Sequence, residues 1–360
     1  MKIIIFAGGV GTRLWPLSRK NSPKQFEKII GDKSTLQQTI DRLSPEFSPK
    51  DIYIATGIRY RDIILKQLPN FSEDNLIFEP EMRDVGPAIG LVTLLLSSKF
   101  PNEPIAILWS DHMIKNIDAF KHSLFTGQNM IEEGKADFVF LAQKPRFANQ
   151  NMGWIEIDKT IKEKDGVSVY TFKQLRYRPK IEEAKDFFIN ENYVWNLGYF
   201  ITTPIYLESL FQIHAPEMYE KLILIQKSWG TTLFEHAMKE IYPTLEKISF
   251  DDLILVKLNP EKIYVVSADL GWSDVGAWEA LKEALTNSED ENAIKGNVML
   301  ESSKDALVFN YRDQLVVGID LSQMLVINTE DVLLICPKIA VPKIKKLVES
   351  LNGTSHEYLT

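Results

Sequence analysis

Short apolar runs alternate with longer amphipathic stretches through the first two thirds of the chain. Residues 36–43 and 87–100 have the apolar spacing of helices. Four apolar runs have the length and composition of buried strands. These runs lie at residues 3–6, 52–55, 105–108 and 138–141. Strands that alternate with helices are typical of an α/β fold, so we expect a mostly parallel sheet covered by helices.

A different pattern begins near residue 298. Short apolar clusters follow one another there at steps of nine, nine and eight residues. They start at residues 306, 315, 324 and 332. Such spacing is typical of small strands in a compact all-β unit, stacked either as rungs of a short β-helix or as a plain meander. Residues 339–351 then have the apolar spacing and the lysines of a closing amphipathic helix.

An acidic polar stretch at residues 287–292 separates these two patterns. It contains no apolar side chain that would be buried, so we expect a linker there. A chain of 360 residues is long enough for about two domains. We therefore predict one domain at residues 1–286 and a second at residues 287–360.

The composition narrows the partners and the compartment. Hydrophobic residues make up 45% of the chain and charged residues 25%, as in proteins with a sizeable packed core. The net charge of -8 opposes general attraction to nucleic acid or to an anionic membrane. No apolar run approaches the ~18–20 residues that cross a bilayer, and nothing resembles a secretory leader. We expect a cytoplasmic protein with neither a membrane nor a nucleic-acid partner.

Three glycines, Gly8, Gly9 and Gly11, follow the first predicted strand. A backbone without Cβ atoms can pass close to a polyphosphate and direct its N–H groups at the oxygens. The first 31 residues carry six cations and one anion, a local charge of +5 in an acidic chain. The six cations are Lys2, Arg13, Arg19, Lys20, Lys24 and Lys28. This combination predicts a site for a small phosphate-bearing ligand, with a simple tight turn as the alternative.

Two familiar nucleotide motifs do not fit this loop. The dinucleotide fingerprint would need a third glycine where the chain has Leu14. The P-loop needs lysine directly after glycine, but Asp32 separates Gly31 from Lys33. The sequence therefore argues against a Rossmann dehydrogenase and against a Walker-type NTPase.

The opening segment resembles the signature of the mannose-1-phosphate guanylyltransferases, a branch of the sugar nucleotidyltransferases. It consists of Phe6-Ala-Gly-Gly-Val-Gly-Thr-Arg-Leu-Trp-Pro-Leu-Ser-Arg19 and then Pro23-Lys-Gln-Phe26. Weaker similarities follow in the family's order, and they are Glu79-Pro80, Gly86-Pro-Ala-Ile89, Ser110-Asp-His112, Gly153-Trp-Ile155, Trp195-Asn-Leu-Gly198, Ser249-Phe-Asp251 and Gly271-Trp-Ser-Asp-Val-Gly-Ala-Trp278. The resemblance implies a Rossmann-like nucleotidyltransferase domain with a mostly parallel sheet, followed by a small C-terminal left-handed β-helix-like domain.

The reaction implied by the resemblance is transfer of GMP from GTP to mannose 1-phosphate, giving GDP-mannose and pyrophosphate. An oxygen of the sugar phosphate would attack the α-phosphorus in line, so catalysis consists mainly of positioning and charge stabilisation. Arg13 and Lys24 would be catalytic, and Asp111 and Asp274 would bind Mg²⁺. The nucleotide-binding residues implied in the same way are Gly8, Gly9, Gly11, Thr12, Glu79, Gly86 and Pro87. For the two aspartates and for Glu79, an ordinary turn or strand-end carboxylate is the alternative.

The implied sugar-binding residues are Gly153, Arg178, Asn196, Gly198 and Asp251. Near them the chain departs from the family pattern. Tyr177-Arg178 replaces a Glu-Lys pair, Val256 replaces a glutamate, and Asp84-Val85 replaces an Asn-Thr pair on the nucleotide side. Because arginine and lysine are not interchangeable at a fitted site, the base and the hexose stay open.

Three hypotheses follow. The first is a guanylyltransferase that binds GTP and a hexose 1-phosphate. The second is a nucleotidyltransferase for another base or another hexose 1-phosphate, favoured by the altered positions. The third is a non-catalytic nucleotide-sugar-binding paralogue. A homodimer through the edge of the β-helix-like domain is an open partner question, since no sequence feature decides it.

Overall fold

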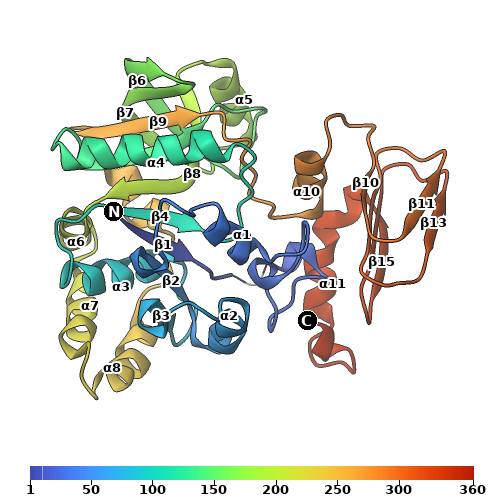
Figure 1. Cartoon of the computed structure of the whole chain (residues 1–360), viewed down its shortest axis with the longest axis horizontal. Helices are drawn as coiled ribbons and strands as arrows, with labels where there is room; N and C mark the ends of the chain where they lie inside the picture. The colour runs from blue at the N-terminus through green and yellow to red at the C-terminus, as the bar shows by residue number, and fades with distance from the viewer. Residues whose placement is uncertain (10) are drawn as a thin grey trace. The chain divides into compact units, whose positions relative to one another are not determined.

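The computed structural model describes residues 1–9 and 11–360, and these divide into two units (Figure 1). The first unit comprises Met1–Gly8, Ile40–Ser110 and Ile114–Trp272. The second comprises Gly9–Thr39, Asp111–Met113 and Ser273–Thr360. The loop after the first strand and a short segment around residue 112 therefore belong to the same unit as the C-terminal strands. The boundaries of these compact units therefore differ from the predicted single domain boundary after residue 286.

A nine-stranded mixed sheet forms the centre of the first unit, in the order β3-β2-β1-β4-β8-β5-β9-β7-β6. The strands from β3 to β4 run parallel, and so do β5 and β9. β8 is antiparallel to β4 and β5, and β7 is antiparallel to β6 and β9. The strands are β1 (Lys2–Phe6), β2 (Ile52–Gly57), β3 (Leu76–Glu79), β4 (Ile105–Trp109), β5 (Phe138–Gln143), β6 (Gly153–Lys164), β7 (Val167–Tyr177), β8 (Tyr193–Thr202) and β9 (Ile263–Ala268). The sheet is therefore mixed, and the expected parallel arrangement holds for the strands from β3 to β4 and for the pair of β5 and β9.

The antiparallel part arises from a hairpin that the apolar pattern did not reveal. β6 and β7 are joined by Asp165 and Gly166, with φ of 53° and 74°. An Asp-Gly pair with positive φ at both positions is the usual two-residue turn between antiparallel strands. The outer part of β6 is exposed, so it has no run of apolar residues. In contrast, all four strands predicted from apolar runs are confirmed as β1, β2, β4 and β5.

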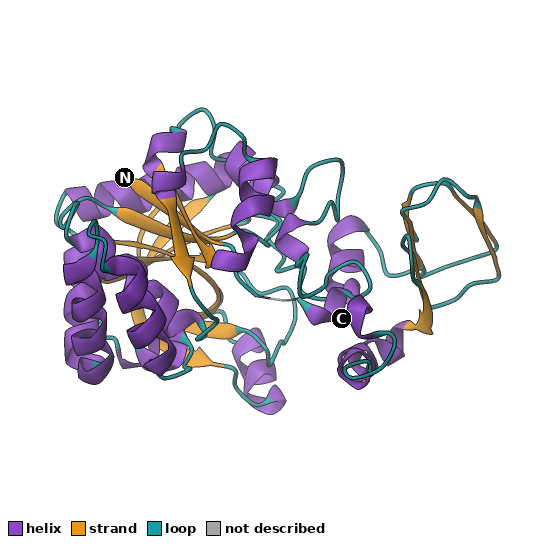
Figure 2. Ribbon diagram, turned by 90° about the horizontal axis from the view of Figure 1, so that it is seen from below, coloured by secondary structure: helices purple, strands orange, loops and turns teal. Residues whose placement is uncertain are grey.

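Helices cover both faces of the sheet (Figures 1 and 2). α4 packs along β5, β8 and β9, while α3 packs against α6 and α7 over the core that contains Ile4, Phe6 and Phe140. The two helices predicted from spacing are confirmed as α1 and α3. The helices of this part of the chain are α1 (Thr35–Asp41), α2 (Arg61–Gln67), α3 (Val85–Ser97), α4 (Ile117–Glu132), α5 (Ile181–Ile189), α6 (Pro204–His214), α7 (Pro216–Ser228), α8 (Phe234–Ile241) and α9 (Phe250–Leu253).

Local sequence explains where several helices begin. The side chains of Asp84, Asn116 and Thr203 accept hydrogen bonds from the first backbone N–H groups of α3, α4 and α6. Such caps satisfy donors that have no partner within the helix. α3 is buried on all sides from Gly86 to Ser97, so its sequence is apolar almost throughout. No helix among the described residues is both long and apolar enough to cross a bilayer.

Short strands at the predicted apolar clusters build the second unit. β10, β12 and β14 pair in parallel, β15 adds antiparallel to β14, and β11 pairs in parallel with β13. Parallel pairing of non-consecutive strands rules out the plain meander. The strands are β10 (Ala293–Lys295), β11 (Val298–Glu301), β12 (Leu307–Asn310), β13 (Val316–Ile319), β14 (Met324–Asn328) and β15 (Leu333–Pro337).

Alternate residues of β12 point into two different cores of this unit. Val308 packs towards Val298 and Val316 of the β11–β13 sheet. Leu307 and Phe309 pack on the other side against α10 (Trp278–Leu285) and α11 (Ile344–Ser350). The predicted closing helix is thus present as α11, preceded by a 3-10 segment at Lys338–Lys343 that contains Pro342.

Candidate active site

The glycine-rich loop presents a bare backbone. Gly9 and Gly11 have φ of 92° and 63°, a conformation that L side chains rarely adopt. Among the described atoms, nothing lies within 4 Å of the position that a Cβ on Gly8 or Gly9 would take. The amide of Val10 lies outside the described residues. The exposed backbone on either side of it suits close approach of phosphate oxygens.

Lys24 lies at the centre of a charged cluster in the second unit. Its Nζ is 2.7 Å from Asp111 Oδ2 and donates to the backbone oxygen of Asp274 at 3.3 Å. Gly11 leaves room for the stem of this lysine, because a Cβ there would lie 2.9 Å from Lys24 Cγ. Burial would raise the pKa of Asp111, but the Lys24 ammonium and His112 hold that pKa below its ordinary value. Asp111 therefore remains a carboxylate at neutral pH.

The segments of Asp111 and Asp274 lie side by side because of a small antiparallel bridge. Met113 N donates to Ser273 O at 2.9 Å, and Ser273 N donates to Met113 O at 3.0 Å. This long-range pair explains how two aspartates so distant in the sequence become neighbours. Sequence spacing contains no trace of it.

Arg13 joins the same cluster from the 3-10 turn Thr12–Leu14. A Cβ on Gly276 would lie 3.1 Å from both Arg13 Nη2 and Asp274 Oδ2, so the two charged groups face the same small space. Trp278 fixes the loop, since its indole N–H donates to Trp15 O at 3.0 Å. The structure therefore brings together the four predicted catalytic and metal-binding residues, Arg13, Lys24, Asp111 and Asp274.

Arg19 has a different role from the one expected of a loop cation. Its Nη1 and Nη2 donate to the Asp331 carboxylate at 2.7 and 2.5 Å, and its Nε donates to Pro16 O at 3.0 Å. Because these partners lie within the second unit, the Arg19 guanidinium stabilises the structure of that unit. The positive charge aimed at a ligand thus comes from Arg13 and Lys24.

The two aspartates fit a hard divalent cation. Mg²⁺ usually takes one or two protein carboxylates and completes its shell with water and substrate phosphates. Within residues 1–9 and 11–360, no group of three or more His, Cys, Asp and Glu side chains is placed to hold a metal ion alone. Asp111 and Asp274 are thus two hard oxygen donors, of the kind that Mg²⁺ prefers, on neighbouring segments.

Most of the predicted sugar-binding residues form a second cluster, in the first unit. Gly153 begins β6 and lies opposite Asn196 of β8. Asn196 Nδ2 donates to Asp251 Oδ1 at 3.2 Å, and Asn196 Oδ1 accepts from Gly198 N at 3.0 Å. Burial, with a smaller contribution from Asp252, raises the pKa of Asp251 to about 6. Asp251 is thus a hydrogen-bonding carboxylate that titrates close to neutral pH.

Arg178 and Gly198 differ in what they offer a ligand. The Arg178 guanidinium is exposed and lies 4.9 Å from the centre of the Tyr177 ring. Gly198 instead has a packing role, because a Cβ there would lie 2.4 Å from Trp109 Nε1. Trp109 Nε1 also donates to Gly198 O at 3.2 Å. Tyr177, which the sequence analysis treated only as a lost carboxylate, belongs to this cluster.

The nucleotide-binding candidates of the first unit are engaged in internal contacts. Glu79 accepts a hydrogen bond from Tyr242 Oη at 2.5 Å, and burial raises the Glu79 pKa to about 7. Gly86 N donates to Ile248 O at 2.9 Å, and a Cβ on Gly86 would lie 2.7 Å from that oxygen. Pro87 is buried in the same turn. Because Ile248 leads into α9, Gly86 supports the segment that carries Asp251.

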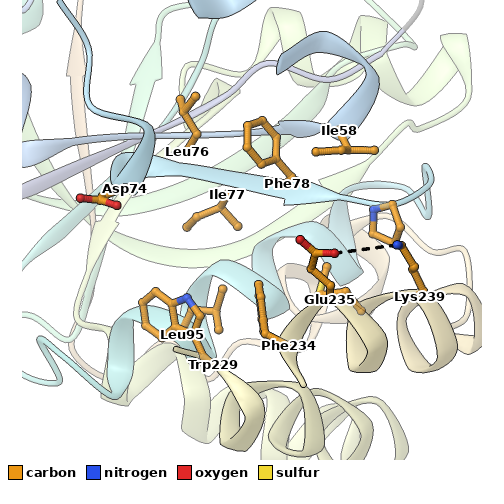
Figure 3. Close-up of a pocket in the computed structure, with 12 residues that line it drawn as sticks. Ile58, Asp74, Leu76, Ile77, Phe78, Leu95, Trp229, Phe234, Glu235 and Lys239 are labelled. Atoms are coloured by element: carbon orange, nitrogen blue, oxygen red, sulfur yellow. Dashed lines mark ion pairs between the residues drawn. The ribbon is translucent and has the colours of Figure 1, made fainter. Parts of the chain in front are cut away.

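An apolar cavity of about 330 Å³ lies elsewhere in the first unit, between β3 and α8 (Figure 3). Phe78 and Phe234 line it, and Glu235 and Lys239 form an ion pair of 3.9 Å there. Trp229, which also lines it, is covered by the Lys99 ammonium at 3.9 Å from the ring centre. The lining side chains include none of the candidate site residues.

Comparisons with known proteins agree with this chemistry. A family model described as nucleotidyl transferase matches residues 2–291. A mannose-1-phosphate guanylyltransferase of Salmonella montevideo is 30% identical, over 99% of this chain and 75% of that protein. One of Escherichia coli is 28% identical, over 97% of this chain and 75% of that protein. A solved structure described as mannose-1-phosphate geranyltransferase from Thermus thermophilus is 27% identical with a TM-score of 0.85, covering 98% of this chain and 99% of that one. Since the family model spans well over half of the chain, and the Salmonella relative is similar over three quarters of its length, this chain belongs to the nucleotidyl transferase family, among its mannose-1-phosphate guanylyltransferases.

Proposed function

We propose that this nucleotidyltransferase transfers GMP from GTP to mannose 1-phosphate and releases pyrophosphate. The observation that carries the proposal is the cluster of Arg13, Lys24, Asp111 and Asp274 beside a glycine-rich loop. Two cations and two carboxylates in one place suit a reaction between two phosphate groups. The curated relatives named as mannose-1-phosphate guanylyltransferases support the choice of substrates.

Charge stabilisation is the main task of this cluster. The sugar phosphate and the triphosphate are both anions, so an oxygen of one reaches the α-phosphorus of the other only when their charges are neutralised. Arg13 and Lys24 are the groups we assign to the triphosphate and to the charge that grows in the transition state. Asp111 and Asp274 would hold Mg²⁺, which when bound neutralises phosphate charge and orients the phosphoryl group.

The second cluster is assigned to the hexose. Asn196 and Asp251 offer a paired amide and carboxylate for ring hydroxyls, and Gly153 lies opposite Asn196. The exposed Arg178 guanidinium is suited to the phosphate of the sugar. Glu79, whose Oε2 accepts from Tyr242, is assigned to the nucleotide.

The C-terminal strands support further proposals. Two small sheets, parallel apart from β15, with one packed core between them suit a short left-handed β-helix. We keep residues 287–360 as that domain and residues 1–286 as the catalytic domain. The family match, which ends at residue 291, supports that division. The strands of the C-terminal domain expose several apolar side chains that a homodimer would cover, namely Met299, Val317, Ile319, Leu333 and Ile335. Light scattering after gel filtration tests the dimer, and a cytoplasmic location is tested by cell fractionation.

The decisive experiment offers the purified protein Mg²⁺, each of the four common nucleoside triphosphates and a panel of hexose 1-phosphates. Pyrophosphate release is measured and the nucleotide sugar is identified. GDP-mannose as the best product supports the proposal. If every pair stays silent while nucleotide still binds, the protein is a non-catalytic nucleotide-sugar binder and the proposal is wrong.

A different base is the second candidate, and one observation favours testing it. Asp84, which stands where the family has asparagine, has φ of 68° and caps α3 by accepting from Val85 N at 2.8 Å. A side chain occupied in this way offers a ligand a different pattern of donors and acceptors from an amide. Another nucleotide sugar as the main product would establish this alternative.

The affinity for the hexose phosphate should depend on the protonation of Asp251. Since the pKa of this carboxyl is raised to about 6, the KM for mannose 1-phosphate should increase as the pH falls through about 6. The charge-assisted hydrogen bond to the sugar is lost there, at a cost of roughly tenfold. Tyr177, Arg178, Asp252 and Asp84 are the charged or titratable groups that act on this cluster.

The comparison with Asp251→Asn isolates this effect, because the sugar phosphate also titrates near pH ~6. The variant keeps the substrate's titration and lacks the carboxylate. The ratio of KM values, variant to wild type, should therefore be largest at pH ~8 and approach one at pH ~5. A constant ratio across that range contradicts the prediction.

A further inference from the structure

Three neighbouring strands meet at Gly153, and we call the position over this glycine the niche. On one side Gly153 pairs with Tyr177 of β7, and on the other it pairs with Asn196 of β8. Residues directly opposite one another in antiparallel strands point to the same face of the sheet. Tyr177 and Asn196 thus flank a position without a side chain, about 9–10 Å apart across two strand spacings.

Glycine suits this position because the Asn196 side chain packs closely against it. A Cβ on Gly153 would lie 3.1 Å from Asn196 Cβ and 3.3 Å from Asn196 Nδ2. Such contacts would push the amide away from the position in which it donates to Asp251. A residue with any side chain would therefore both fill the niche and disturb its polar wall.

The polar wall is held in a fixed orientation. Gly198 N donates to Asn196 Oδ1, and Asn196 Nδ2 donates to Asp251 Oδ1, so the amide cannot rotate freely. A rigid donor–acceptor arrangement of this kind selects among hydroxyl patterns better than a mobile one.

Tyr177 forms the opposite wall with a polar group at its tip. Its ring packs against the apolar core of the first unit, and the Arg178 guanidinium covers it at 4.9 Å. The Asp251 carboxylate acts electrostatically on the Tyr177 hydroxyl, which places the two groups in the same neighbourhood. Burial and the Asp251 charge raise the pKa of Tyr177 to about 12, so the hydroxyl stays protonated and can both donate and accept.

We propose that Tyr177 is a specificity-determining residue, whose hydroxyl hydrogen-bonds one ring hydroxyl of a hexose 1-phosphate seated over Gly153. The inference rests on the proposed function and extends it to a residue with a chemistry that a carboxylate lacks. A neutral hydroxyl accepts from one sugar hydroxyl and donates to another oxygen, whereas a carboxylate only accepts. Tyr177 therefore shapes which hexose phosphates the enzyme uses.

The test combines Tyr177→Phe with mannose 1-phosphate and its four analogues that lack one hydroxyl, at position 2, 3, 4 or 6. Against mannose 1-phosphate the variant should lose roughly 10- to 100-fold in kcat/KM, mostly through KM, with the KM for GTP unchanged. Against one analogue, the one without the hydroxyl that Tyr177 meets, wild type and variant should be equally active. A tyrosine with a purely structural role would not produce that one equal pair.

Tyr193→Phe is the matched control. Tyr193 begins β8 in the same sheet, stacks on Phe187 at 4.2 Å and lies opposite Glu156, away from the niche. We expect it to leave all five kcat/KM values unchanged. Equal losses of Tyr177→Phe on every analogue, or no loss on any of them, would overturn the inference.

Calorimetry measures the binding of mannose 1-phosphate and the same four analogues to the wild type and to Tyr177→Phe, without turnover. The affinities give the same comparison of the two proteins. This binding comparison therefore decides the inference for a Tyr177→Phe protein that turns over too slowly to assay. Product formation by the wild-type protein with no selective pattern would leave the guanylyltransferase assignment intact and reject the role of Tyr177. A wild-type protein that makes no nucleotide sugar would reject the proposed function, and the binding comparison alone would then judge Tyr177.

Discussion

Lys24→Gln is expected to reduce kcat by roughly 10²–10³ and, in the nucleotide-free protein, to strengthen the binding of a divalent cation. The first effect is that of removing one preorganised charge donor from a phosphoryl-transfer site. The second follows from geometry, because the Lys24 ammonium lies 2.7 Å from Asp111 Oδ2 and also donates to Asp274 O. Without it, the Asp111 carboxylate loses the ammonium that neutralises it.

The size of the second effect follows from Coulomb's law. A unit charge at about 4 Å acts with roughly 4 kcal/mol at the effective dielectric of a protein surface, and solvent reduces this further. We therefore expect at least a tenfold fall in the dissociation constant for Mn²⁺, measured by electron paramagnetic resonance or calorimetry. Lys28→Gln is the control, since Lys28 is exposed and lies in the same segment.

These two readouts separate the possible roles of Lys24. If kcat falls while Mn²⁺ affinity stays the same, Lys24 acts on the triphosphate alone and the ion pair with Asp111 is incidental. If both change, the same ammonium neutralises Asp111 in the free protein and the triphosphate in the complex. Unchanged kcat would remove Lys24 from the catalytic residues.

The fold was predictable where apolar runs are continuous. β1, β2, β4 and β5 are buried on both faces, and so their sequences stand out. The hairpin of β6 and β7 did not stand out, because the outer half of β6 is exposed and polar and the buried residues of β7 are interrupted by more exposed ones. Its one local signal was the Asp165-Gly166 turn, which the periodicity analysis did not use.

The site divides in the same way between local and long-range information. Arg13 and Lys24 stand within one short segment whose resemblance to a family was readable. The segments of Asp111 and Asp274 lie side by side because of the bridge between Met113 and Ser273, which no local pattern encodes. Arg19 illustrates the opposite error, since a cation in the right segment is engaged by Asp331.

Tyr177 shows a third limit of sequence interpretation. A departure from a family pattern was read as the loss of a carboxylate, while the structure places the new side chain beside Gly153 and near Asp251. Only the pairing of three strands reveals that the position lies on the same face as the predicted sugar-binding residues Gly153 and Asn196.

A buried ion triad gives the largest expected effect on stability. Lys282 and Lys338 both lie 2.6 Å from Asp305 Oδ1, and the Lys282 side chain is only 3% exposed. The triad joins α10, the turn before β12 and the 3-10 segment before α11. Asp305→Ala leaves a buried lysine without its counter-ion, so we expect a loss of roughly 3–5 kcal/mol in the free energy of unfolding.

Asp305→Asn separates the effect of the lost charge from the effect of the substitution on the backbone conformation. Asp305 has φ of 52°, a left-handed conformation that asparagine tolerates better than alanine, so Asp305→Asn should cost less than Asp305→Ala but still destabilise. Asp331→Asn is the control, because the Asp331 side chain is 36% exposed and its ion pair with Arg19 is expected to contribute less than the buried triad. Urea unfolding followed by circular dichroism measures all three variants.

Acid should remove the same contribution from the wild-type protein. Burial would raise the pKa of Asp305, but the bonds from Lys282 and Lys338 lower it below the ordinary value of 3.8. A carboxyl whose pKa is lowered in the folded state stabilises the protein above its unfolded pKa, and the stabilisation disappears as the pH falls below that value. The difference in unfolding free energy between wild type and Asp305→Asn should therefore be constant at neutral pH and shrink below pH ~4. A difference that stays constant into acid would show that the triad contributes through packing, with no part for its charge.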